Sequence, residues 1–113
     1  MNSTALKERL RADLKAAMQA KRDATMRVLR QLIAALDNAE AVPIDSAPKQ
    51  VRPGQGSADA EAVRRDLDAD SIATLLAAEI AARHAAAADY RAGGREVEAD
   101  ALESEVTIIE RYR

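Results

Sequence analysis

The sequence predicts an all-α protein in which two helical hairpins pack as a small four-helix domain. Three observations favour this fold class. Nearly a quarter of the 113 residues are alanine, a strong helix former, and Tyr90 and Tyr112 are the only aromatic residues. Apolar residues recur at spacings of three and four, the period of an amphipathic helix. All three prolines fall in one central segment, so helical stretches are expected on both sides of it.

The first helix is expected to begin at Ser3 or Thr4, either of which can cap its first turn, and to run to about Ala20. The segment Lys21-Arg22-Asp23 is the expected break, with Asp23 as the cap of a second helix that runs to about Ala41. A short link between two amphipathic helices predicts an antiparallel hairpin. The alternative is one unbroken helix, because the link contains neither glycine nor proline.

Residues 42–57 are predicted to form a linker. They hold all three prolines and two of the four glycines, and no helix persists through that density of helix breakers. Ser57 can cap a short helical turn over residues 58–65, and the alternative is that this segment has no regular structure. The chain is therefore predicted to be one helical domain, residues 1–113, with a Pro/Gly-rich internal linker.

The third helix is expected to begin near Asp68, which suits the cap position because Asp70 and Ser71 follow it in the first turn. It is expected to end at Ala92-Gly93-Gly94, since glycine is the usual residue just past a helix. A fourth helix follows from about Arg95 to the end of the sequence. The short glycine turn between these helices predicts a second antiparallel hairpin.

Each predicted helix carries one apolar stripe, and the four stripes together are the candidate core. They consist of Leu6, Leu10, Leu14, Ala17 and Met18; Met26, Leu29, Leu32 or Ile33, and Leu36; Ile72, Leu75, Leu76, Ile80 or Glu79, Ala87 and Tyr90; and Val97, Ala101, Leu102, Val106, Ile109 and Tyr112. The sequence has no Phe and no Trp, so the helices are expected to approach closely.

Composition and charge exclude several classes of protein. The absence of cysteine excludes disulfide scaffolds, cysteine-bound zinc and thiol nucleophiles, and the single histidine excludes a site with several histidine ligands. No stretch has the length or apolar character of a signal peptide or a membrane span, so no membrane contact and a cytoplasmic location are expected. The net charge of −2 argues against a protein dedicated to nucleic acid.

Six carboxylates and one histidine are the candidate groups for catalysis or metal binding. The carboxylates of the fourth helix are Glu96, Glu98, Asp100, Glu103, Glu105 and Glu110. Few basic residues lie near them in the sequence, so a solvated helix face is expected. His84 lacks a second histidine or a cysteine to bind a metal with it, and it is expected to lie on the helix surface or at the boundary of the core. We therefore predict no catalytic residue, no metal site and no cofactor, and nothing in the residues supports an enzyme activity.

The first hairpin contains the candidate nucleic-acid-binding residues. Residues 1–41 hold eight basic and five acidic side chains, a net charge of +3. The candidates recur at helical spacings and are Lys7, Arg11, Lys15, Arg27 and Arg30. Such a stripe can follow a phosphate backbone, without sequence preference because no aromatic residue is interleaved to stack on bases. The alternative is a solvated face on which local pairs such as Arg9 with Asp13 neutralise the charge.

Four parts of the sequence, taken in order, carry a family resemblance: Leu6-Lys7-Glu8-Arg9-Leu10 with Asp13-Leu14-Lys15-Ala16-Ala17-Met18; Val28-Leu29-Arg30 with Ala34-Ala35-Leu36-Asp37-Asn38-Ala39-Glu40; Glu79-Ile80-Ala81-Ala82-Arg83; and Tyr90-Arg91-Ala92-Gly93-Gly94-Arg95 with Glu105-Val106 and Ile109-Glu110-Arg111-Tyr112. In order and spacing, these segments resemble the YqeY family, whose domain also forms the C-terminal part of the GatB subunit of the tRNA-dependent amidotransferase. They span nearly the whole chain apart from residues 42–66.

The resemblance implies an all-α accessory domain linked to a carbon–nitrogen ligase that takes glutamine as its amido donor. The implied partner is tRNA, contacted weakly through its backbone, and the alternative is a small helical module that binds a protein and has no tRNA role. The amidotransferase's catalytic residues lie in other domains and subunits, so none is carried over to this chain. The sequence also stops at Tyr112-Arg113, where the family usually continues into a tail domain credited with contacting tRNA.

Overall fold

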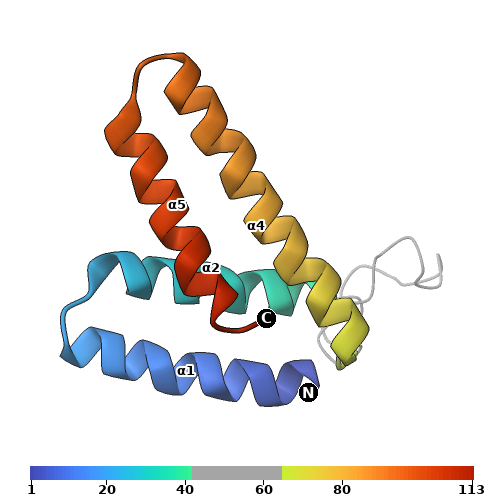
Figure 1. Ribbon diagram of the computed structural model, residues 1–113. Helices are drawn as coiled ribbons and strands as arrows, with labels where there is room; N and C mark the ends of the chain where they lie inside the picture. The colour runs from blue at the N-terminus through green and yellow to red at the C-terminus, as the bar shows by residue number, and fades with distance from the viewer. Residues whose placement is uncertain (42–64) are drawn as a thin grey trace, which may run out of the picture.

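The computed structural model describes residues 1–41 and 65–113, which form two antiparallel helical hairpins (Figure 1). The first hairpin consists of α1 (Ser3–Gln19) and α2 (Asp23–Glu40), and the second of α4 (Ala69–Ala92) and α5 (Glu96–Glu110). The predicted all-α fold of two hairpins is confirmed. The predicted linker, and the predicted helical turn except for its last residue, lie outside the described residues.

Helix α2 is the centre of the described structure. It packs against α1 along the first hairpin and is also contacted by both helices of the second hairpin. In Figure 1, α1 and α2 lie side by side as a layer, and the second hairpin crosses this layer steeply. The glycine turn between α4 and α5 points away from the layer, so the far half of the second hairpin projects from it.

The first turn of α1 is capped by a residue that the sequence analysis did not select. Asn2 holds the cap position, and its side chain accepts a hydrogen bond from the N–H of Ala5 at 2.9 Å. The prediction that Ser3 or Thr4 caps this helix is therefore wrong. Asp68 caps α4 as predicted, by accepting from the N–H of Ser71 at 2.8 Å, and this bond lowers the pKa of its carboxyl group.

Both hairpin turns end their first helix in the same way. In the second hairpin, Gly94 has a φ of +76°, and the N–H of Arg95 reaches back to the carbonyl of Tyr90 at 2.8 Å. In the first hairpin Lys21 takes this left-handed place with a φ of +57°, and the N–H of Arg22 bonds the carbonyl of Ala17 at 2.9 Å. The predicted break is confirmed, and the alternative of one unbroken helix is wrong.

The N-terminus of α2 differs from its prediction. Arg22 occupies the cap position without a side-chain hydrogen bond, and Asp23 is the first helical residue rather than the cap. Its carboxylate still lies in the first turn, where negative charge interacts favourably with the helix dipole.

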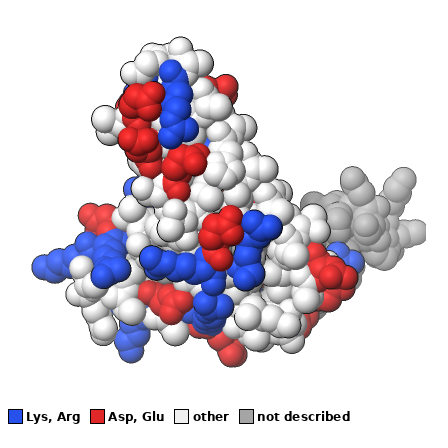
Figure 2. All heavy atoms as spheres, in the orientation of Figure 1, with Lys and Arg blue, Asp and Glu red and all other residues white. Residues whose placement is uncertain are grey.

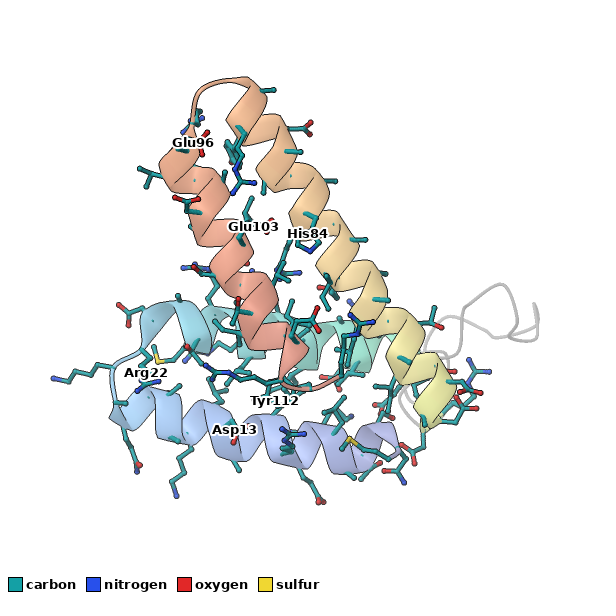
Figure 3. The ribbon with its side chains drawn as sticks, viewed as in Figure 1. Asp13, Arg22, His84, Glu96, Glu103 and Tyr112 are labelled. Atoms are coloured by element: carbon teal, nitrogen blue, oxygen red, sulfur yellow. The ribbon has the colours of Figure 1, made fainter. Side chains whose placement is uncertain are left out.

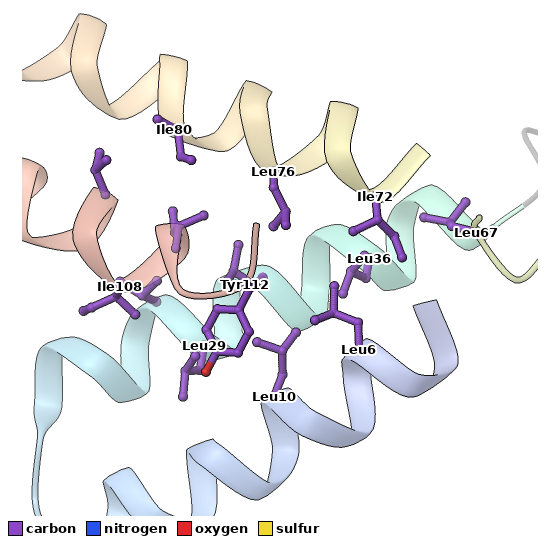
Figure 4. Packing of buried hydrophobic residues seen from close by; sticks show 14 residues of the cluster. Leu6, Leu10, Leu29, Leu36, Leu67, Ile72, Leu76, Ile80, Ile108 and Tyr112 are labelled. Atoms are coloured by element: carbon purple, nitrogen blue, oxygen red, sulfur yellow. The ribbon is translucent and has the colours of Figure 1, made fainter. Parts of the chain in front are cut away.

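The hydrophobic core lies where the two hairpins cross (Figure 4). Its fully buried large apolar side chains are Leu6, Leu10, Val28, Leu29, Leu32, Leu36, Leu76 and Ile109. All but Val28 belong to the predicted stripes. Further from the crossing, Ala87 and Ala99 are fully buried, so small side chains fill part of the interface between α4 and α5 and allow close approach.

Some predicted core positions are exposed instead. Met18, beside the buried Ala17 in the last turn of α1, is 52% exposed. Val97 is 79% exposed because the start of α5 projects beyond the α1–α2 layer. Ala101 is also exposed, whereas Ala99 and Ile108, which lie outside the predicted stripe, are buried. The inner face of α5 is therefore rotated relative to the prediction.

Candidate functional site

Lys7, the first of the five predicted phosphate-binding cations, is engaged inside the protein. Its side chain is only 14% exposed, and its Nζ atom lies 3.0 Å from Asp37 Oδ1 and 2.5 Å from Glu40 Oε1. The hydrogen bond to Glu40, followed by the one to Asp37, raises the pKa of Lys7. Lys7 therefore joins α1 to α2, and the carboxylates of Asp37 and Glu40 neutralise its charge.

The same carboxylate of Glu40 belongs to a polar junction that ties three segments together. The buried Ser3 hydroxyl lies 2.5 Å from Glu40 Oε2 and 2.7 Å from Asp66 Oδ1, and it accepts from the N–H of Leu67 at 2.7 Å. One hydroxyl carries one proton, so it donates to one carboxylate at a time. Hydrogen bonds from Ser3 and from the N–H of Thr4 lower the pKa of Asp66.

Substituting Ser3 with alanine tests this junction. Ser3→Ala leaves the buried carboxylate of Glu40 and the N–H of Leu67 without this partner, and the expected loss is about 1–3 kcal/mol of unfolding free energy. Urea denaturation followed by circular dichroism measures it. Ser104→Ala is the matched control, since Ser104 is exposed and bonds only a carbonyl of its own helix; equal losses for the two variants would contradict the assignment.

Arg27, the fourth predicted cation, is also paired. Its Nη2 atom lies 3.3 Å from Glu105 Oε2, and Arg83 Nε approaches the other oxygen of Glu105 at 3.0 Å. Arg83 additionally contacts Glu79 at 3.2 Å and donates to Gln31 Oε1 at 2.7 Å. This network joins α2, α4 and α5, so Arg27 stabilises the crossing of the hairpins while its side chain stays half exposed.

The carboxylates of α5 contact a larger number of basic side chains than the sequence analysis predicted. Glu105 is buried in the network just described, which corrects the expectation of a uniformly solvated face. The others each contact a basic side chain of the second hairpin or of the chain's last residue: Glu96 and Asp100 contact Arg91, Glu98 contacts Arg95, Glu103 contacts His84, and Glu110 contacts Arg113.

His84 lies at the surface as predicted. Its side chain is half exposed, and Nδ1 lies 2.8 Å from Glu103 Oε1 on the neighbouring helix (Figure 3). Among residues 1–41 and 65–113, no group of three or more histidine and acidic side chains could hold a metal ion. The pair is therefore a surface contact between α4 and α5.

The remaining predicted cations, Arg11, Lys15 and Arg30, are exposed and form no ion pair with the described residues. Arg11 and Lys15 follow Lys7 at steps of four along α1, and Arg30 lies two turns before Asp37 on α2. Since Lys7 and Asp37 contact each other across the hairpin, the three free cations lie on the side of the hairpin that this ion pair marks. By helical phase, three of the five predicted residues therefore share one side of the hairpin, and we call them the basic surface.

A second set of cations, which the sequence analysis missed, surrounds a hollow beside α1. Arg9, Arg22 and Arg111 line this space of about 370 Å³ together with Asp13 and Tyr112. Arg9 does not pair with Asp13 as the sequence suggested: its guanidinium lies over the Tyr112 ring at 4.6 Å, while Asp13 accepts the Tyr112 hydroxyl at 2.6 Å. No sequence motif signals this arrangement, because its residues come from α1, a turn and the segment after α5.

Figure 2 shows Lys and Arg side chains gathered over the α1–α2 layer with Asp and Glu side chains among them, and the projecting end of the second hairpin also shows both signs of charge. This distribution agrees with the net charge of +3 for residues 1–41.

None of the four described helices combines the length and the apolar character of a membrane-crossing helix. No protein-family model and no curated protein matches this chain.

Proposed function

We propose that this chain is a non-catalytic helical accessory domain of the GatB/YqeY type, whose first hairpin contacts the phosphate backbone of RNA. The observation that carries the proposal is the group of three exposed cations, Arg11, Lys15 and Arg30, which have no ion-pair partner among the described residues and lie on one side of the hairpin. The link to tRNA and to an amidotransferase rests on the resemblance of the sequence to that family.

The same observation limits the strength of the contact. Each neutralised phosphate releases condensed counterions, so the logarithm of the affinity should fall with the logarithm of salt concentration by about 0.7–0.9 per phosphate. Three cations therefore give a slope of about −2 to −3 and an affinity in the range of non-specific binding, on the order of 10 μM or weaker at physiological salt. Without an aromatic platform beside them, sequence preference is not expected.

Charge reversal on this basic surface is the test. The double substitution Arg11→Glu with Arg30→Glu should abolish binding of fluorescently labelled tRNA at low salt, measured by anisotropy at two salt concentrations. The single variants Arg30→Glu and Arg91→Glu change the net charge equally, but Arg91 lies on the projecting hairpin among carboxylates. Arg30→Glu should weaken binding, and Arg91→Glu should not. Equal effects of the two, or tight salt-insensitive binding, would contradict the proposal.

The second candidate function is binding of a protein partner without any role for tRNA. It is favoured by the neutralisation of Lys7 and Arg27, which leaves fewer cations for RNA than the five that the sequence analysis predicted. If the unmodified chain does not bind tRNA even at low salt, RNA contact is excluded. Pull-downs from native lysate with and without ribonuclease then separate partners that are held through RNA from those held directly.

A further inference from the structure

The hollow beside Tyr112 is separate from the basic surface of Arg11, Lys15 and Arg30. Arg9 and Asp13 are each offset by two positions from that series along α1, which turns them about half-way around the helix. Arg22 from the α1–α2 turn lines the hollow, as do Arg111 and Tyr112 from the segment that follows α5. Figure 3 shows Asp13, Arg22 and Tyr112 where the end of α5 comes down to α1.

One wall of the hollow is held in place by contacts within the protein. The Tyr112 hydroxyl donates to Asp13 Oδ2 at 2.6 Å, and Arg9 both stacks over the Tyr112 ring and donates to the carbonyl of Arg111 at 3.1 Å. Tyr112 is largely buried, and this burial, followed by the contact with Asp13, raises the pKa of its phenol. Arg9 is therefore positioned before any ligand arrives, which reduces the entropy cost of binding.

The other two arginines are free to meet a ligand. Within the described part of the chain, the side chains of Arg22 and Arg111 form no hydrogen bond and no ion pair, although both line the hollow. Three guanidinium groups against the single carboxylate of Asp13 leave an excess of two positive charges. A planar guanidinium presents paired N–H donors that match the oxygens of phosphate, and its charge persists at any physiological pH.

We propose that this hollow binds the phosphate group of a small organic phosphate, with Arg9, Arg22 and Arg111 as the binding residues. A phosphate monoester carries close to two negative charges, which matches the excess charge, whereas a carboxylate carries only one. The volume of about 370 Å³ lies at the lower end of the range for small-molecule sites and leaves room for the organic part. The inference does not depend on RNA binding by the opposite side of α1.

The direct test is a titration of the full chain with inorganic phosphate and with glycerol 3-phosphate, followed by NMR of the arginine Nε–H signals. The signals of Arg9, Arg22 and Arg111 should move together along one saturating curve. Sodium chloride at matched ionic strength should not reproduce this curve. Shifts that are spread over most arginines, or that do not saturate, would overturn the proposal.

Three single substitutions sharpen this test because they should act in different directions. Arg22→Gln removes an exposed cation at a turn and should weaken glycerol 3-phosphate binding about tenfold, the effect of losing one charge-assisted hydrogen bond. Asp13→Asn still accepts the Tyr112 hydroxyl but removes the negative charge from the hollow, so it should strengthen binding. Arg30→Gln, on the other side of the hairpin, should change nothing; if it weakens binding as much as Arg22→Gln, the hollow is not the site.

A terminal phosphate of RNA is the other possible source of the same chemical group. A short RNA with a 5′-phosphate is compared with the same RNA ending in a 5′-hydroxyl. Glycerol 3-phosphate should bind as tightly as the phosphorylated RNA if the phosphate group alone is recognised. A phosphorylated RNA that binds much more tightly, and loses that advantage in Arg22→Gln but not in Arg30→Gln, would overturn the assignment to a small organic phosphate.

Discussion

Replacing Leu76 with alanine is expected to lower the unfolding free energy by about 2–5 kcal/mol. Leu76 is 1% exposed and belongs to the apolar cluster formed where α4 crosses the first hairpin, together with Leu6 and Leu36 (Figure 4). The loss combines the transfer free energy of the removed methyl groups with the cavity they leave.

Urea denaturation followed by circular dichroism at the helix band measures this loss, and Val97→Ala is the control. Val97 is 79% exposed, so its substitution should change the unfolding free energy by less than about 0.5 kcal/mol. In a domain of this size the Leu76 variant should also melt at least about 8 °C lower. A loss below about 0.5 kcal/mol would mean that this face of α4 does not meet the core.

The second large effect is expected from removing Glu105. Its side chain and that of Arg83 are each 11% exposed, so Glu105→Leu leaves a nearly buried guanidinium without its carboxylate. Breaking such a pair costs about 3–5 kcal/mol, and we expect the lower end, about 3 kcal/mol, because Arg83 keeps Glu79 and Gln31. The substitution also frees Arg27 on α2, which is exposed enough to be solvated.

Two further variants separate the broken ion pair from a simple packing defect. Glu103→Leu removes a carboxylate of the same helix that contacts half-exposed His84, and it should cost less than about 1 kcal/mol. The double substitution Arg83→Met with Glu105→Leu removes both charges and should be more stable than Glu105→Leu alone, since apolar residues of similar volume often replace a buried pair at little cost. A double variant that is less stable than the single one would refute this account.

The four helices follow from local features of the sequence. Three features affect only residues close to them in the chain, so they can be predicted from the sequence alone. They are the apolar period of three and four, the cap at Asp68 and the glycines at the α4–α5 turn. The break at Lys21 was also predicted, although its left-handed conformation was not. A lysine in that conformation costs about 1–2 kcal/mol, and the hydrogen bond from the N–H of Arg22 to Ala17, together with the packing of α1 on α2, offsets this cost.

The buried face of α5 and the hydrogen-bond partners of Ser3 could be identified only from the tertiary structure. The apolar stripe of α5 begins with Val97, but this end of the helix projects past the layer that would bury it. Ser3 has the chemistry of a helix cap, yet Glu40 and Asp66 compete for its hydroxyl from 37 and 63 positions away. Local propensity cannot foresee partners that only the fold brings together.

Local patterns in the amino-acid sequence suffice to predict that this protein is helical, where its four described helices lie, and which residues carry positive charge. Which of those charges remain free depends on how the two hairpins pack. Lys7 and Arg27 are neutralised by carboxylates 30 or more positions away, and Arg9, Arg22 and Arg111 meet around one hollow although they lie on three separate segments. The physical reason is range: helix formation depends on neighbours along the chain, whereas ion pairing and concavity depend on distances in space that the packing of the two hairpins sets.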